Sequence, residues 1–415
     1  MSGKKEWIVG IDFSEKVTQL AYYDRGEDKP VSVSQKAGAK EYEIPTVLCR
    51  RATDYCFLVG HEAEYFLAEK GATPVEDLFA VSESKEEILV GQTRLSPGKL
   101  LAEFFHGVLK FLGRPDILKE LRCLVITMPH LSPVQVGNLT EAMEQLGLMQ
   151  EEYFLQDYDQ SFYYYAMTQR RENWNRNIGW YAFREGEVFF QKLSVQNAGT
   201  PVVVRLRQAG NLALPVDPLK CDLAFCDFVK ETLGEDLYSM ILLTGEGFSQ
   251  EWAKKSTEEL CQRQRKVYFG NNLFVKGAVA GGKEKLENNK LKGYRFLCDS
   301  MVLVNVGMDM RIMGANAYYP LIEAGKNWYE YHPSCEFLLD GVEELVFVVS
   351  HPGESDKQRA VMDLPGLPKR PRGTTRLSLQ MAYSSPEECQ VMVKDMGFGE
   401  MFPSSGKSWE ETIKW

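Results

Sequence analysis

The chain has 415 residues, of which 44% are hydrophobic and 26% are charged, and its formal net charge is -10 at pH 7. This length exceeds the roughly 250–300 residues that a single hydrophobic core usually serves, so we expect at least two domains. The negative charge argues against non-specific binding to nucleic acid or anionic membranes, and no apolar run approaches the roughly 18 residues of a membrane-spanning helix.

The first part of the chain alternates predicted strands and helices. Residues 7–13 and 17–23 have the apolar patterns of strands, and the short turn between them predicts a β-hairpin. Residues 96–112 and 132–146 have helical apolar stripes, and each begins with a serine cap followed by a proline. Further strands are expected at 43–47, 57–60, 124–128 and 154–155, and a further helix at 160–170.

A second predicted hairpin pairs residues 178–183 with 187–193, and the alternation of strands and helices continues to residue 282. This alternation predicts an α/β domain over 1–282. Residues 283–298 begin with a charged, glycine-flanked stretch and are expected to form a linker. From 299 to 415 no helical period survives, and short alternating runs between turns predict an all-β sandwich. The remaining expected elements are strands at 201–207 and 241–244 and helices at 224–233 and 249–263.

The string at residues 8–14 resembles the first phosphate motif of the actin and sugar-kinase superfamily. The resemblance implies that Asp12 holds a magnesium-bound water, while the backbone and side chains at Gly10, Ser14 and Lys16 approach the phosphates of a nucleotide. Ser14 replaces the glycine that the family has in this turn, and charged residues replace its pair of hydroxyls. The spacing of these residues alone favours an ordinary solvated hairpin turn. The order of the later motifs favours the phosphate motif instead.

Four later strings resemble further elements of the same superfamily, in the same order. Residues 124–129 resemble its second strand motif, and Asp157 stands at the position of its catalytic glutamate. Gly245 and Gly247 stand in a string that resembles the adenosine motif, and residues 277–282 resemble the final helix of the fold. The resemblance therefore implies an actin-like, ribonuclease-H-like ATPase fold, with Asp12 and Asp157 as the candidate catalytic carboxylates.

Other parts of the sequence depart from this pattern. In the second phosphate motif, residues 180–187, Ala182 replaces the aspartate, and Glu185 and Glu187 add negative charge beside the expected phosphates. Between residues 205 and 221 a short loop replaces the subdomain that supplies one side of the adenine site in the family. Because phosphoryl transfer depends on positioned charge, we do not expect ATP hydrolysis. Binding of ATP or ADP with Mg2+ stays open.

The last quarter of the chain contains a predicted β-meander, with alternating runs at 376–381 and 390–393. The amino-acid sequence of this meander resembles that of the substrate-binding sandwich in the DnaK-type, or heat-shock 70, chaperones. The resemblance implies that the sandwich holds an extended peptide, and no helical lid is expected because the chain stops at Trp415. It would place the peptide-binding site at Met308, Met310, Ile312 and Met313, although the same side chains could instead pack the core.

Cysteine and histidine usage bears on location and on metals. The nine cysteines are scattered without a CxxC pair, which favours reduced thiols in the cytoplasm. The five histidines show no ligand spacing with cysteine, so no metal site is expected.

The favoured hypothesis is a cytoplasmic, chaperone-like pseudo-ATPase with weak or no nucleotide binding. It would bind a polypeptide or a partner protein through its β-sandwich, with no nucleic-acid or membrane partner. One alternative is a divergent ATP-dependent chaperone or actin-like ATPase that uses Asp12, Asp157 and Lys16. A second alternative is a subunit of a filament or assembly.

Overall fold

The computed structural model describes residues 5–34, 41–196, 199–270, 272–288, 290–353 and 356–414. The chain divides into two units. Unit 1 consists of Met1–Val195 and Leu206–Lys292, and unit 2 consists of Gln196–Arg205 and Gly293–Trp415. No helix among the described residues combines the length and the apolar character that a membrane crossing requires.

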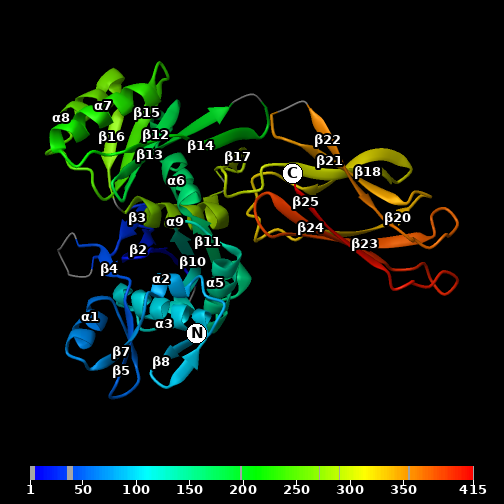
Figure 1. The fold of residues 1–415 in the computed structure, drawn as a ribbon, viewed down its shortest axis with the longest axis horizontal. Helices are drawn as coiled ribbons and strands as arrows, with labels where there is room; N and C mark the ends of the chain where they lie inside the picture. The colour runs from blue at the N-terminus through cyan, green and yellow to red at the C-terminus, as the bar shows by residue number, and fades with distance from the viewer. Residues whose placement is uncertain are drawn as a thin grey trace. The chain divides into compact units, whose positions relative to one another are not determined.

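The first sheet of unit 1 has the strand order β11-β10-β1-β2-β3, with β4 also paired to β2 (Figure 1). Strands β1, β10 and β11 run parallel, whereas β2 is antiparallel to β1 and to β3. The hairpin predicted from 7–13 and 17–23 is thereby confirmed. The strands are β1 (Trp7–Phe13), β2 (Val17–Asp24), β3 (Lys29–Ser32), β4 (Glu43–Pro45), β10 (Leu121–Met128) and β11 (Tyr153–Asp157).

Helices α3 (Pro97–Leu109) and α5 (Pro133–Gln145) begin at the two predicted serine caps. The hydroxyl of Ser96 accepts a hydrogen bond from the NH of Lys99, and Ser132 forms a capping box with Gln135. Smaller elements fill the chain between β4 and β10. They are β5 (Leu48–Arg51), β6 (Phe57–Val59), α1 (Gly60–Ala68), β7 (Ala72–Val75), α2 (Leu78–Val81), β8 (Ile88–Val90), β9 (Thr93–Leu95) and α4 (Ile117–Glu120).

A second sheet has the order β16-β15-β12-β13-β14-β17. Strands β12, β15 and β16 run parallel and β13 is antiparallel to β12, which confirms the second predicted hairpin. Residues 202–205 of β14 pair with β17 and belong to unit 2, whereas the rest of β14 belongs to unit 1. The elements are β12 (Asn177–Arg184), β13 (Glu187–Gln196), β14 (Val202–Ala213), α7 (Pro218–Leu233), β15 (Tyr238–Gly245), α8 (Lys254–Leu260), β16 (Lys266–Phe269) and β17 (Tyr294–Leu297).

The prediction of a helix over 249–263 is wrong in extent, because α8 spans only Lys254–Leu260. Before α8, the indole NH of Trp252 donates to the carbonyl of Gly247 and holds a turn in place of helix. After α8, Arg263 takes a φ of 55°, which an α-helix does not tolerate.

The two sheets have the same internal topology. In the first sheet, β1 has the antiparallel β2 on one side and the parallel β10, followed by β11, on the other. In the second sheet, β12 has the antiparallel β13 on one side and the parallel β15, followed by β16, on the other. Unit 1 therefore contains mixed sheets together with helices, which agrees with the predicted α/β class, and its actin-like fold stays a prediction.

Helices α6 (Tyr158–Met167) and α9 (Leu273–Lys283) lie between the two sheets in Figure 1. Their backbones touch, since a Cβ added to Gly277 would lie 1.9 Å from the carbonyl oxygen of Ser161. Helix α9 continues into a π-helix at Glu284–Asn288, within the range that the sequence assigned to a linker.

Every named element within residues 293–414 of unit 2 is a strand, apart from residues the structure does not describe. Apart from β17, which pairs with β14, they form two antiparallel sheets, β19-β18-β21-β22 and β20-β23-β24-β25. Alternate residues of β23 and β24 are buried, so one face of this sheet is apolar and lies in the interior. The packing of the two sheets against each other as a sandwich stays a prediction. The strands are β18 (Asn305–Ile312), β19 (Ala315–Ile322), β20 (Ser334–Leu339), β21 (Glu344–Ser350), β22 (Lys357–Asp363), β23 (Thr375–Tyr383), β24 (Glu388–Asp395) and β25 (Ser408–Lys414).

Candidate functional site

The first predicted phosphate turn joins β1 to β2, and its aspartate is buried. Asp12 is 5% exposed, and its Oδ1 accepts a hydrogen bond of 2.8 Å from the hydroxyl of Tyr158. Ser14 is half-buried, and its hydroxyl donates to the carbonyl of Val17 at 2.6 Å, which closes the turn. Asp12 and Ser14 are therefore engaged with the protein itself, whereas Lys16 is exposed.

Burial changes the acid–base behaviour of Asp12. It raises the pKa of Asp12 from 3.8 to about 7, because the charged carboxylate is deprived of water, and the hydrogen bond from Tyr158 offsets only part of this effect. Burial and the nearby Asp12 in turn raise the pKa of Tyr158 well above 10.0, so its hydroxyl keeps its proton and remains a donor. Mg2+ is held by ionised carboxylates and water, so a carboxyl that is partly protonated near pH 7 is a poor ligand for it.

A chain of aromatic rings leads from Tyr158, the partner of this aspartate, to the second sheet. The ring of Tyr158 stacks on Phe274 of α9, with centroids 3.7 Å apart and ring planes 1° apart. Phe274 meets the edge of Trp180 at 5.5 Å, and Trp180 stacks on Phe162 of α6 at 4.7 Å. The rings of Phe274, Trp180 and Phe162 are buried, so the ring of Tyr158 packs against an apolar cluster.

The second predicted phosphate turn is a tight hairpin. Strand β12 ends at Arg184 and β13 begins at Glu187, so Glu185 and Gly186 alone form the turn, with φ of 49° and 80°. Two successive positive φ values are typical of a type I′ turn. The charge of Arg184 acts on Tyr158 and lowers its pKa slightly against the effect of burial, which places Tyr158 near both turns.

Two further departures from a nucleotide site are visible in the second sheet. Ala182 is buried in β12, so no carboxylate is present at the position where the family has its second aspartate. Strand β14 ends at Ala213 and α7 begins at Pro218, so only residues 214–217 connect them and no subdomain is inserted here.

Two of the three candidate glycines serve close packing. A Cβ on Gly10 would lie 2.8 Å from a methyl group of Val279, so this glycine lets α9 approach β1. A Cβ on Gly245 would lie 2.0 Å from the carbonyl oxygen of Phe183, so this glycine lets β15 approach β12. Gly247 differs, because an added Cβ would meet no atom within 4 Å. The packing explains Gly10 and Gly245 without a ligand.

Asp157, the second candidate carboxylate, caps α6. It is 4% exposed, and its side chain accepts a hydrogen bond of 2.8 Å from the NH of Gln160. A cap of this kind stabilises a helix by roughly 1 kcal/mol. Strand pairing sets Asp12 opposite Thr127 on β10 and Asp157 opposite Met128 of the same strand, so β10 separates the strands that carry the two carboxylates.

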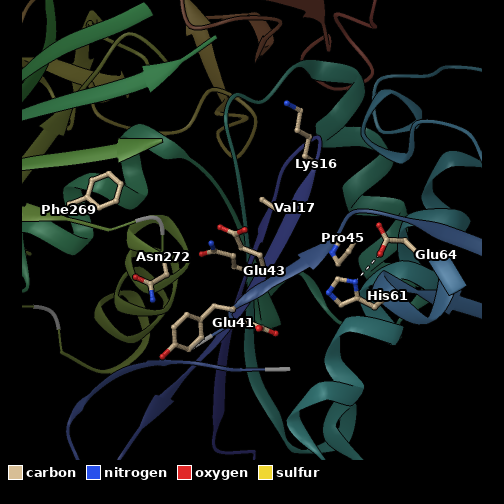
Figure 2. Close-up of a pocket in the computed structure, with 11 residues that line it drawn as sticks. Lys16, Val17, Glu41, Glu43, Pro45, His61, Glu64, Phe269 and Asn272 are labelled. Carbon is tan, nitrogen blue, oxygen red and sulfur yellow. Dashed lines mark hydrogen bonds and ion pairs between the residues drawn. The ribbon is translucent and has the colours of Figure 1, made fainter. Parts of the chain in front are cut away.

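A cavity of about 1070 Å³ opens beside the first turn, between β2, β4, α1 and the start of α9. Figure 2 shows His61 and Glu64 on one side of the drawn residues and Phe269 and Asn272 on the other. Of the residues in the predicted nucleotide site, Lys16 alone lines this cavity.

The lining of this cavity, among the described residues, is more acidic than basic. It includes the carboxylates of Glu41, Glu43 and Glu64 and a single ammonium group, that of Lys16. The Nδ1 of His61 lies 2.8 Å from a carboxylate oxygen of Glu64. The described lining thus has more carboxylates than ammonium groups, and the carboxylate of Glu64 is paired with His61. Sequence reasoning missed these residues because they lie outside the recognisable motifs.

The described residues contain no group of three or more histidine, cysteine, aspartate or glutamate side chains that could hold a metal ion. The carboxylates of the cavity are therefore spread along its walls and do not converge on one point.

The predicted peptide-binding residues belong to β18 and the turn after it. Met308, Met310 and Ile312 alternate along β18 and so point to one face, with Met308 buried and Ile312 40% exposed. Met313 has a φ of 48° and, with Gly314, forms the turn into β19, where its side chain is fully exposed. The four side chains thus run from the interior of the sheet to the tip of a hairpin.

Comparisons with known proteins give two family matches and matches to solved structures, among them one of MamK. Residues 29–299 match the model described as "Family of unknown function (DUF5716) C-terminal". Residues 301–415 match the model described as "Domain of unknown function (DUF8552)". A solved structure of a non-polymerising MamK mutant bound to AMPPNP is 12% identical, with a TM-score of 0.42, and the match covers 68% of this chain and 100% of that chain. No curated protein matches.

Proposed function

The chain belongs to the DUF5716 C-terminal family, whose function is unknown, and we propose that it is a pseudo-ATPase scaffold with weak or no nucleotide binding. The observation that carries this proposal is the state of Asp12. Its carboxyl is buried, bonded to Tyr158 and has a pKa of about 7. Phosphoryl transfer needs an ionised, accessible carboxylate to position the metal and its water, whereas Asp12 is buried and, with a pKa of about 7, only partly ionised at neutral pH.

A divergent ATP-dependent chaperone or actin-like ATPase, with ATP or ADP and Mg2+, is the alternative. It is favoured by the exposed Lys16 and by the open space above Gly247. It is opposed by the buried Ala182 and by Glu185 and Glu187 in the second turn, which bring negative charge to the place where phosphates would bind.

For the partner, we propose that unit 2 binds a polypeptide or partner protein by strand addition, as its resemblance to the DnaK-type sandwich implies. The exposed Ile312 and Met313 at the tip of the β18–β19 hairpin offer apolar contacts for such a partner. Met308 and Met310 continue the same strand toward the interior. The scattered cysteines support a cytoplasmic setting.

Isothermal titration of the full chain with ATP and with ADP, each with Mg2+, tests the nucleotide part of the proposal. We expect no saturable heat up to about 1 mM nucleotide, which corresponds to less than about 4 kcal/mol of binding. Circular dichroism on the same sample shows whether the chain is folded. Micromolar, one-to-one binding that is lost in Lys16→Gln, but kept in the exposed control Lys119→Gln, would overturn it. Concentration-dependent light scattering of the unliganded chain would instead favour an assembly subunit.

A further inference from the structure

Strand β19 forms one edge of the sheet β19-β18-β21-β22 in unit 2. Its residues 315–318 are exposed, and among the described residues no strand pairs with β19 on the side away from β18. Two features end this open stretch. Pro320 has no NH to donate, and the carbonyl of Leu321 already accepts a hydrogen bond from the hydroxyl of Tyr331. The open segment, residues 315–319, is therefore the part of this edge that a further strand can join.

The open segment lacks the protection that the other edges of the two antiparallel sheets of unit 2 have. Edge strands usually carry charged side chains, which oppose the addition of another strand. Strand β22 has Lys357 and Arg359, β20 has Glu336, and β25 has Glu411. None of the eight residues of β19 is charged. The edge of β19 therefore permits strand pairing that charges oppose at the other three edges.

A second copy of the chain fits this edge. Two copies that pair through the same strand are related by a two-fold axis, so a charge beside the axis would meet its own counterpart. An uncharged edge avoids this repulsion. With Ala317 on the axis, Ala315 stands opposite Tyr319 of the second copy, and Asn316 stands opposite Tyr318 of the second copy. Directly opposed side chains share a face, so each large ring meets a smaller side chain.

Charged residues on the neighbouring strand β18 select this register. Asp309 is opposite Tyr318 and Arg311 is opposite Asn316, and both charged side chains are exposed. With Ala317 on the axis, the row of residues that contains Asp309 of one copy continues to Arg311 of the other. An axis at Tyr318 or at Asn316 would instead set Asp309 or Arg311 in one row with its own counterpart. The flanking charges are therefore complementary when Ala317 lies on the axis.

We propose that the chain forms a two-fold dimer in which residues 315–319 pair antiparallel with the same residues of a second copy. The pairing joins one sheet of each copy into a continuous sheet, and each strand supplies backbone donors and acceptors to the other. A two-fold contact closes on itself, so it produces a dimer and not a growing filament. The dimer does not depend on the proposed pseudo-ATPase function or on polypeptide binding.

Sedimentation equilibrium of the full chain measures this association. We expect the average mass to rise toward twice that of one chain between about 1 and about 300 µM, as for a small interface. Ala317 is exposed, so Ala317→Lys and Ala317→Glu are expected to fold, which circular dichroism checks. Each variant sets a charge opposite its own counterpart and should weaken the dimer by at least about tenfold. An equimolar mixture of the two variants pairs opposite charges and should restore the dimer.

The matched control is Val361→Lys. It adds the same charge to an exposed position of β22, at the opposite edge of the same sheet, and should change the dissociation constant by less than about twofold.

Each other outcome overturns the proposal. A wild type that stays monomeric leaves the edge to a strand of another protein. Association that Ala317→Lys and Val361→Lys weaken equally lies elsewhere on the molecule, and growth beyond twice the mass of one chain is not a closed contact. A mixture of the two Ala317 variants that stays monomeric shows that Ala317 does not lie on the axis. Nucleotide and polypeptide binding are measured separately, so failure here leaves both of those proposals standing.

Discussion

Replacing Asp12 with asparagine is expected to stabilise unit 1 at neutral and alkaline pH. Burial raises the pKa of Asp12 from 3.8 to about 7, so the folded chain holds this proton more tightly than the unfolded chain does. The associated stability is complete below about pH 4 and is lost as the pH rises to about 7. Asparagine carries no charge and can still accept the hydrogen bond from Tyr158.

The size of the effect follows from the same two values. One unit of pKa corresponds to about 1.36 kcal/mol, so the difference between 3.8 and about 7 amounts to ~4 kcal/mol. This is an upper bound, because water that enters the fold around a charged Asp12 reduces the cost. We expect Asp12→Asn to match the wild type at pH 4 and to exceed its free energy of unfolding by up to ~4 kcal/mol at pH 8.

Native-state hydrogen exchange of the amides in β1 and β2 measures the free energy of unfolding of unit 1 separately from that of unit 2. Asp227→Asn is the control, because the Asp227 side chain is 77% exposed and pairs only at the surface with Lys230. It should change stability by less than about 1 kcal/mol. If Asp12→Asn is instead less stable than the wild type at pH 8, Asp12 is ionised and stabilised in the folded chain, and the ATPase alternative regains its metal-binding residue.

Two further pairs of variants test the packing and the electrostatics of the fold. Asp395 is 0% exposed, and Arg370 donates two hydrogen bonds of 2.8 Å to it. Arg370→Met removes this cation from the buried carboxylate and should therefore destabilise unit 2 by about 3–5 kcal/mol. In urea unfolding, the exposed Arg372→Met should cost less than about 1 kcal/mol, and equal losses would refute the argument. Gly10→Ala should destabilise unit 1 by about 1–3 kcal/mol, because the added methyl group clashes with α9. Gly137→Ala, on an exposed face of α5, should instead stabilise unit 1 by about 0.5–1 kcal/mol. If hydrogen exchange shows that both variants change the free energy of unfolding in the same direction, the packing argument is wrong.

Local signals in the sequence predicted much of the fold. The serines at 96 and 132 cap helices because a hydroxyl needs only the NH three residues later, and this information lies within one turn of chain. The two hairpins were predictable for the same reason, since strand pattern and turn are adjacent in the sequence.

The candidate site depended on contacts that no local pattern encodes. Tyr158 meets Asp12 and Phe274 across long stretches of chain, and nothing around residue 158 marks it as the partner of either. For Asp157, the local sequence is informative but fits two roles. Its spacing fits both a catalytic carboxylate and a helix cap, and only the hydrogen bond to Gln160 shows that it serves as a cap.

The close contact of α6 with α9 has a mechanical consequence for the molecule. Closure of two halves of a protein around a ligand commonly uses a hinge or a sliding of packed helices between them. Here the two helices touch at Gly277, and Phe162 and Phe274 pack from both helices onto Trp180 of the second sheet. Opening this joint would separate aromatic pairs, each worth roughly 0.5–1.5 kcal/mol beyond its buried area, and would expose their apolar surface to water. We therefore expect the two sheets of unit 1 to move little against each other, so that unit 1 offers a partner a surface of fixed shape.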